Sequence, residues 1–259
     1  MDSPGTQKER LMKNESVDFG YQKVSSAEKT KLVADVFKKV ASRYDLMNDF
    51  MSLGSHRLLK RILLNMSEIT PTSSVLDLAG GTGDMTALFA DVISDHKNLI
   101  LADYSREMIN HARNRLIDKG FSKINFLVTE AERLPLKSNQ FDCICISFGF
   151  RNFTNKEQAL EEAYRTLRPK GVLLILEFSK PTNSIVKNTY KGFQAIWPTM
   201  GKLLVGSRQP YEYLIESIEK HPNQDTLKQM LQDAKFESVT CNNFIGGIAA
   251  IHKGYKAIG

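Results

Sequence analysis

Asp77 and Asp103 are the acids whose surroundings most clearly indicate a ligand site. Asp77 lies in a short apolar run, 75–79, which is followed at once by the glycine turn 80–83 and by apolar residues at helical spacing. A strand, a glycine turn and a helix in this order let backbone N–H groups and a helix N-terminus face a polar or charged ligand. A glycine turn alone does not name that ligand, because dinucleotide enzymes use the same arrangement.

The residues around the turn favour S-adenosylmethionine (SAM) over NAD. The dinucleotide fingerprint needs a third small residue after its glycines, but Thr86 or Asp84 stands at that place, depending on the frame. The carboxylate of Asp77 would repel a pyrophosphate, whereas it suits the ammonium of methionine. Asp103 ends the next apolar run, where an acid can accept hydrogen bonds from both ribose hydroxyls. The pattern Asp-x-Ala-x-Gly-x-Gly resembles the first motif of Rossmann-like methyltransferases.

Apolar runs alternate with helical patterns from residue 74 onward, which predicts a Rossmann-like α/β fold with a doubly wound sheet. We expect seven strands, mostly parallel, with one strand of a C-terminal hairpin antiparallel to the rest. The expected strands are 75–79, 99–103, 124–129, 141–147, 171–178, 238–244 and 248–256. The expected helices are 29–40, 85–93, 107–118, 156–167, 211–220 and 225–234.

Two segments outside this alternation are expected to cover the substrate. Residues 1–28 are polar and aperiodic, which predicts a mobile arm, and 29–259 should form a single domain. Within that domain, 29–70 is expected to be a helical lid, with a surface helical hairpin as the alternative. An irregular insertion at 180–210 is rich in aromatic residues and should form the other half of an apolar cover.

Composition limits the setting of the protein. The 259 residues carry a net charge of +6, with basic clusters that could meet nucleic acid or anionic lipid, or could simply be solvated helix faces. The three cysteines have no metal-ligand spacing, and neither do the histidines at 96, 111 and 252, so no metal site is predicted. No segment reaches the ~20 apolar residues of a membrane span, and no signal peptide is evident. These features indicate a soluble or surface-bound protein of a reduced, cytoplasmic compartment.

Five motifs in order along the chain resemble the ubiquinone/menaquinone biosynthesis C-methyltransferase family, a class I SAM-dependent group. They are Tyr44-Asp45-x-Met47-Asn48-x-x-Met51-Ser52-x-x-x-His56, the turn 75–84, Ser147-Phe148-Gly149-x-Arg151-Asn152, Arg168-Pro169-x-Gly171 with Glu177-Phe178-Ser179-Lys180-Pro181, and His221-Pro222-x-Gln224-Asp225-Thr226-Leu227. The likeness extends over about residues 19–255. It implies C-methylation of a polyprenylated hydroquinone, either 2-polyprenyl-6-methoxy-1,4-benzoquinol, demethylmenaquinol or both.

The resemblance also implies which residues contact the cofactor. The set comprises Asp77, Gly81, Thr82, Gly83, Asp103, Tyr104, Glu130, Ala131 and Ser147. Glu130 departs from the family pattern, in which Asn or Asp precedes the alanine, so its contact should run through water or be replaced by the N–H of Ala131. Leu59 also departs, at a position where the family carries Trp, and this change should affect the packing of the lid.

Three residues are candidates for the chemistry on the hydroquinone. Arg151 is the first, for stabilising a phenolate or polarising a water that takes the proton, because guanidinium is too basic to be a general base itself. The competing interpretation is that Arg151 pairs with an acid such as Glu177 and holds its loop. His56 and Tyr44 are second candidates for proton handling, with a structural, hydrogen-bonded histidine as the alternative for His56.

Other functions fit the residues less well. Methylation of exocyclic amines in RNA or DNA usually goes with an Asn/Asp-Pro-Pro-aromatic turn, which is 147–150 here and reads Ser-Phe-Gly-Phe. A non-catalytic scaffold would not need the retained glycines. The expected partners are therefore the quinol, an anionic membrane surface visited transiently on the cytoplasmic side, and no nucleic acid. A homodimer or a quinone-biosynthesis complex stays open.

Overall fold

The apolar runs form the expected sheet. The computed structural model describes residues 16–40, 49–52 and 54–258. Its main sheet has seven strands in the order β5 (Asn125–Val128), β4 (Leu99–Asp103), β3 (Val75–Leu78), β6 (Phe141–Ser147), β7 (Leu167–Phe178), β9 (Ala249–Lys256) and β8 (Phe236–Phe244). β9 runs antiparallel to both of its neighbours, β7 and β8, and every other neighbouring pair in this sheet is parallel. The prediction of a mostly parallel sheet with one antiparallel strand is confirmed.

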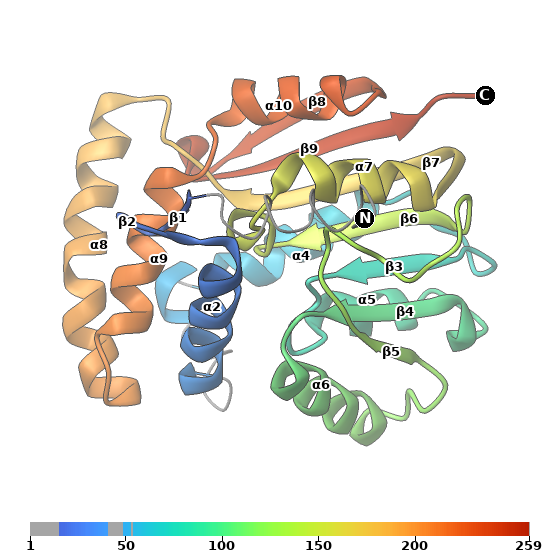
Figure 1. Ribbon diagram of the computed structural model, residues 1–259, viewed down its shortest axis with the longest axis horizontal. Coiled ribbons are helices and arrows are strands. Elements are labelled where there is room, and N and C mark those ends of the chain that lie inside the picture. The colour runs from blue at the N-terminus through green and yellow to red at the C-terminus, as the bar shows by residue number, and fades with distance from the viewer. Residues whose placement is uncertain (1–15, 41–48, 53, 259) are drawn as a thin grey trace, which may run out of the picture.

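Helices cover both faces of the sheet (Figure 1). Because side chains alternate along a strand, Cys143 and Cys145 pack on one face, and Ile144 and Ile146 pack on the other. The first face meets α4 (Ser55–Met66), α5 (Asp84–Ala90) and α6 (Arg106–Asp118), and the second meets α7 (Lys156–Thr166) and α10 (Gln224–Asp233). The two cysteines behave as the small apolar core residues that their spacing predicts.

A short hairpin replaces part of the expected mobile arm. Strands β1 (Ser16–Phe19) and β2 (Gln22–Ser25) pair around a two-residue turn that Gly20 enters with φ 56°. The backbone N–H of Tyr21 donates to Glu216 Oε2 at 3.1 Å, and its hydroxyl donates to Glu219. Each strand has four residues, and its anchors lie almost 200 positions away, so local periodicity gave no sign of it.

The expected irregular insertion is a long helix. Helix α8 (Ser184–Val205) is capped at its N-terminus by Asn183, whose side chain accepts the N–H of Ile185 at 2.8 Å. Gly206 caps its C-terminus in the left-handed conformation. Pro198 lies inside it without ending it. Trp197 is fully buried and packs edge-on against Tyr190 and Phe193, with ring centroids 5.9 and 5.6 Å away. Burial of this aromatic face stabilises the helix despite its central proline.

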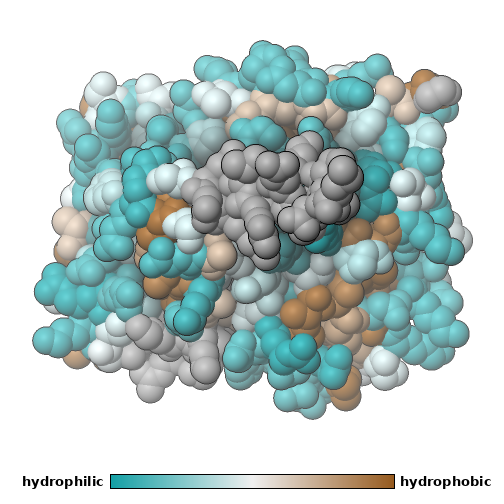
Figure 2. Space-filling view, in the orientation of Figure 1, coloured by the Kyte–Doolittle hydropathy of each residue, from teal (hydrophilic) through white to brown (hydrophobic). Residues whose placement is uncertain are grey.

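Helices α2 (Ser26–Val40), α8 and α9 (Gln209–Lys220) stand together at one end of the strands, at the left of Figure 1. Figure 2 shows the same side of the molecule, and hydrophilic side chains cover most of it. A group of hydrophobic side chains lies over the part of the sheet that carries β5 and α6. The exposed Val128 and Ile117 lie on those elements. Among the described residues, no helix combines the length and the apolar content needed to cross a membrane.

Candidate cofactor and substrate site

Asp103 is held at the mouth of the site by two backbone N–H groups. Neighbouring parallel strands end at the same edge, so the glycine turn after β3 lies beside the end of β4. Gly81 N–H donates to Asp103 Oδ2 at 2.9 Å, and Ser105 N–H donates to Oδ1 at 2.8 Å. Burial raises the pKa of Asp103, and these N–H groups act in the opposite direction. Each oxygen keeps a lone pair, so the fixed carboxylate can still accept two hydroxyls.

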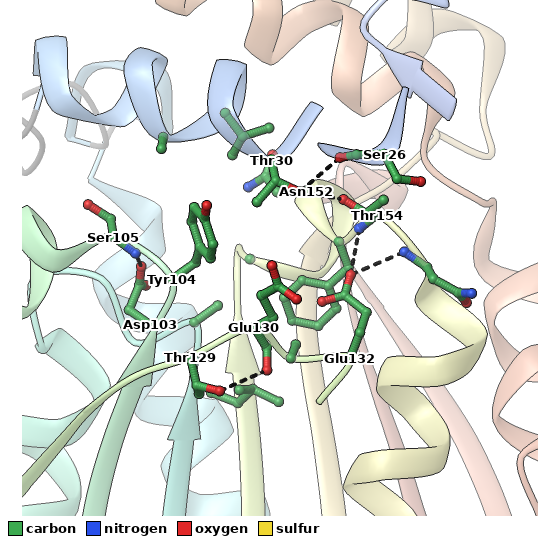
Figure 3. Close-up of a pocket in the computed structure, with 18 of the residues that line it drawn as sticks. Ser26, Thr30, Asp103, Tyr104, Ser105, Thr129, Glu130, Glu132, Asn152 and Thr154 are labelled. Atoms are coloured by element: carbon green, nitrogen blue, oxygen red, sulfur yellow. Dashed lines mark hydrogen bonds between the residues drawn. The ribbon is translucent and has the colours of Figure 1, made fainter. Parts of the chain in front are cut away.

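A cavity of about 520 Å³ opens beside Asp103. Its floor is the carboxyl end of the strands and includes Tyr104, Glu130 and Ala131, and its roof is the first half of α2 (Figure 3). Glu130 points into the cavity, so its longer side chain is accommodated there. The roof contributes Ser26, Ala27, Thr30, Val33 and Ala34, none of which was a predicted site residue, although the last three fall within the expected lid at 29–70.

A smaller recess beside the glycine turn contains Asp77 and Ser147. The Asp77 side chain is 1% exposed, and its Oδ2 accepts the hydroxyl of Thr86 at 2.6 Å. Burial raises the pKa of Asp77 to about 6. Within the described part of the chain, Asp77 Oδ1 and Ser147 Oγ are buried without a hydrogen-bond partner. Buried polar atoms normally have partners, so these two indicate a ligand that donates hydrogen bonds, such as an ammonium group.

Asp84 closes this recess with two cations that the sequence did not point to. Lys60 Nζ lies 2.8 Å from its Oδ2, and Arg115 Nη1 lies 2.6 Å from its Oδ1. Burial alone would raise the pKa of Asp84, but the two charges hold that pKa at about 2. Arg115 also donates to the carbonyl oxygen of Thr82 at 3.3 Å, so the ion-pair cluster fixes the glycine turn.

The loop after β6 packs tightly on the turn after β3. A Cβ added at Gly149 would lie 2.6 Å from the Cβ of Ala79, which is closer than real contacts allow. Ala79 and Phe148 both adopt positive φ, at 58° and 56°. Such strained residues at the ends of adjacent strands are typical of ligand sites.

Arg151 forms a buried ion pair. Its Nη1 donates to Glu177 Oε1 at 2.8 Å and to the carbonyl oxygen of Phe148, while its backbone N–H donates to Glu177 Oε2 at 3.1 Å. The pair joins the loop after β6 to the end of β7. Arg151 lines a cavity separate from the one that contains Asp103. The geometry therefore supports the pairing role considered for Arg151.

The other two candidates for the chemistry are His56, which is buried away from the site, and Tyr44, which the structure does not describe. His56 is buried, and its Nδ1 lies 2.8 Å from Ser52 Oγ. Burial lowers the pKa of His56, and the charge of Lys60 adds to the effect, so the ring is neutral near pH 7. It does not line either of the two recesses described above. Tyr44 lies outside the described residues. Leu59 is buried in the main core, so the shorter side chain still packs there.

The two expected halves of the cover meet at one aromatic contact. The rings of Phe50, from the N-terminal segment, and Phe193, from α8, have centroids 6.1 Å apart. Met51 is buried in the same core as Trp197. These contacts place the motif around residue 50 against the helix that replaces the irregular insertion.

Comparison with known proteins shows the family of this chain. A model of the ubiE/COQ5 methyltransferase family matches residues 23–256. The chain belongs to this family. The ubiquinone/menaquinone biosynthesis C-methyltransferase UbiE of Pseudomonas paraeruginosa is 46% identical over 240 residues, which are 92% of this chain and 94% of that protein. UbiE of Pseudomonas syringae pv. tomato has the same identity and coverage. The family resemblance read from the five motifs is confirmed.

Solved structures show the same fold at low identity. The putative methyltransferase of Haloferax volcanii, in complex with the Trm112 activator, has a TM-score of 0.64 and 16% identity over 88% of this chain and 98% of that one. Phosphoethanolamine N-methyltransferase 2 of Haemonchus contortus, in complex with S-adenosyl-L-methionine, has a TM-score of 0.56 and 14% identity over 77% of this chain and 52% of that one. Both support the methyltransferase fold.

Proposed function

We propose that this chain transfers the methyl group of SAM to a ring carbon of a polyprenylated hydroquinone in ubiquinone or menaquinone biosynthesis. One observation carries the proposal. The 46% identity to UbiE extends over 92% of the chain, and the cofactor motifs within that stretch meet at one edge of the sheet.

The residues present fit the parts of SAM. Asp77 Oδ1 and Ser147 Oγ, both buried and without partners among the described residues, would hold the amino-acid end. Asp103 would accept the ribose hydroxyls, and Ala131 and Glu130 would border the adenine. When bound, SAM supplies an electrophilic methyl group on its sulfonium. The chain aligns the ring carbon, excludes water and stabilises the phenolate that makes that carbon nucleophilic.

Arg151 serves this reaction as a positioning residue. Through Phe148 and Glu177 it fixes the loop that carries Ser147 and Gly149, next to the predicted cofactor. Direct stabilisation of the phenolate by its guanidinium is the alternative role. Measurements of stability and turnover on the same variants separate the two, because only the direct role lowers turnover in a fully folded protein.

The test is methyl transfer from labelled SAM. The purified protein should label both a short-chain prenylated benzoquinol and demethylmenaquinol, or one of the two, and should leave transfer RNA unlabelled. The matched control is Asp103→Ala, which should reduce labelling at limiting SAM. Label on RNA, or no label on either quinol by a preparation that binds SAM, would contradict the proposal.

We also propose that the enzyme meets its substrate at an anionic membrane surface through the outer side of α8. Trp197, which lies in the expected insertion at 180–210, is buried, so it cannot insert into a membrane. Instead Ile185, Ile196 and Leu203 are 77%, 49% and 78% exposed. The intervals between them are close to whole helical turns, so they share one side of the helix. Exposed Lys187 is on the same helix and would add about 1 kcal/mol of attraction to anionic lipid at most.

Co-sedimentation with vesicles that contain phosphatidylglycerol tests this surface. Binding should fall as salt rises, and Leu203→Glu should weaken it. Ile117→Glu is the matched control, because Ile117 is 50% exposed on α6, far along the sheet from α8. Absence of binding at low salt would mean that a partner protein delivers the quinol.

A further inference from the structure

A second cavity, of about 230 Å³, lies next to the cofactor cavity and is strongly cationic. It is enclosed by the β1–β2 hairpin, the start of α2, the 3₁₀ turn η3 (Phe150–Asn152) with the start of α7, and α9. The described residues that line it include five basic side chains and a single carboxylate, Asp18; the basic ones are Lys23, Lys29, Arg151, Lys156 and Lys220. In the methyl transfer proposed above, Arg151 is the one residue of this lining to which we gave a role.

Three of these basic side chains, Lys23, Lys220 and Arg151, already form ion pairs with carboxylates. Asp18 Oδ1 lies 3.1 Å from Lys23 Nζ and 3.7 Å from Lys220 Nζ, and Arg151 pairs with Glu177. These contacts use the lone carboxylate of the lining. They leave Lys29 and Lys156 as the charges to be explained.

Lys29 and Lys156 donate to the same atom, the carbonyl oxygen of Phe153, at 3.0 and 3.1 Å. Lys29 is only 4% exposed. Within the described part of the chain, neither ammonium forms an ion pair with a carboxylate. Burial, together with the charge of Lys156, lowers the pKa of Lys29 to about 8, although the charges of Glu132 and Asp18 act in the opposite direction. Two ammonium groups that share one carbonyl oxygen in a buried position indicate that the cavity binds an anion.

His221 adds a neutral donor or acceptor to the same cavity. It is 3% exposed, and its ring stands edge-on to Phe150 with centroids 6.1 Å apart. Its Nδ1 is buried and has no hydrogen-bond partner among the described residues. Burial lowers the pKa of His221 well below its usual value, and neighbouring Lys156 and Arg151 contribute, so the ring is neutral. A neutral imidazole can place an N–H toward an anion.

We propose that this cavity binds a phosphate group, either as free phosphate or as a small phosphomonoester. Such a group carries about −1.5 to −2 charges at pH 7, which matches the two unmatched ammonium groups of Lys29 and Lys156. Its oxygens can accept hydrogen bonds from both lysines and from His221 at once, whereas a carboxylate has only two oxygens.

The position of the cavity links phosphate to the cofactor. Val17 and Thr154 line both cavities, and α2 forms the roof of the cofactor cavity while its Lys29 reaches into the cationic one. Phosphate would therefore tie the hairpin and α2 to α7 and α9, and so hold the roof closed over SAM. Since coupling between two sites is reciprocal, SAM should tighten phosphate binding by the same factor.

Calorimetry with inorganic phosphate, at ionic strength matched by sodium chloride, tests the site directly. We expect saturable binding that is weakened about tenfold in Lys29→Gln and in Lys156→Gln, since each removes one charge-assisted contact. Lys156 is less buried than Lys29, so its variant should fold even if the Lys29 variant does not. Lys123→Gln, on the exposed loop before β5, is the matched control and should bind as the parent does.

Glycerol 3-phosphate, compared with inorganic phosphate, tells whether an ester or the free ion is preferred. SAM affinity, measured with and without saturating phosphate, should rise severalfold in the parent and stay constant in Lys156→Gln. Failure of folded, SAM-binding protein to bind either compound at millimolar concentration would overturn the site. Phosphate binding with unchanged SAM affinity would overturn the coupling.

Discussion

Removal of the Arg151 guanidinium should lower the stability of the protein much more than it lowers the turnover of the folded molecules. The Arg151 and Glu177 side chains are 5% and 2% exposed, and their charged atoms lie 2.8 Å apart. Truncating one partner of such a pair leaves the other charge buried, which costs about 3–5 kcal/mol. For a chain of this size each kcal/mol lowers Tm by about 2–4 °C, so Arg151→Ala should lose on the order of 10 °C.

A double-mutant cycle isolates the pair. Arg151→Met and Glu177→Gln should each destabilise the protein strongly. The double variant removes both charges at nearly constant volume and should recover most of the lost stability. Arg151→Lys keeps the charge but not the planar fork that reaches both Phe148 and Glu177, so it should recover stability only in part.

The decisive assay measures Tm, SAM affinity and turnover on one preparation of each variant. If Arg151 positions the loop, Tm and SAM affinity fall together and turnover per folded molecule is nearly intact. An unchanged Tm with turnover reduced by roughly 10²–10³ would refute this reasoning and assign the guanidinium to the phenolate.

Three further predictions concern the cofactor edge. Asp103→Ala should weaken SAM binding in calorimetry by about 2–4 kcal/mol, because two charge-assisted hydrogen bonds are lost; unchanged affinity would place the ribose elsewhere. Because burial raises the folded pKa of Asp77 to about 6 from an ordinary 3.8, stability should fall as pH rises from about 4 to about 6. Asp77→Asn should therefore stabilise the cofactor-free protein by up to about 3 kcal/mol at pH 7.5, and little at pH 4, while weakening SAM; an equal gain in Tm at both pH values would contradict this. Gly149→Ala should lower Tm and SAM affinity together, since its Cβ would lie 2.6 Å from that of Ala79; a normal Tm would show that the loop yields.

Much of the sheet could be predicted because its signals are local. The strands 99–103 and 141–147 were predicted with the bounds that β4 and β6 have. Each is a short apolar run, and a buried parallel strand needs little more than that. Asp103 and the glycine turn were predictable for a related reason, since parallel strands bring their carboxyl ends to one edge.

The cap could not be predicted in the same way. The hairpin at residues 16–25 depends on acids of α9 almost 200 positions away, and α8 continues through Pro198 because Trp197 is buried. Tertiary contacts of this kind outweigh local propensity. The same limit applies to Lys60 and Arg115, which belong to the site only because Asp84 attracts both.

The buried polar atoms without partners show where this fold gives up stability. Among the described residues they include Asp77 Oδ1 and Ser147 Oγ in the recess, and His221 Nδ1 in the cationic cavity. Each such atom is costly when it stays unsatisfied, and an ordinary core would replace it with an apolar side chain. His221 lines the cavity that the hairpin and α2 help to form, whereas Asp77 and Ser147 lie in the recess that adjoins the cofactor cavity beneath α2. Ligands that satisfy these atoms would therefore stabilise the protein as they bind, and the roof is the element through which each would affect the other.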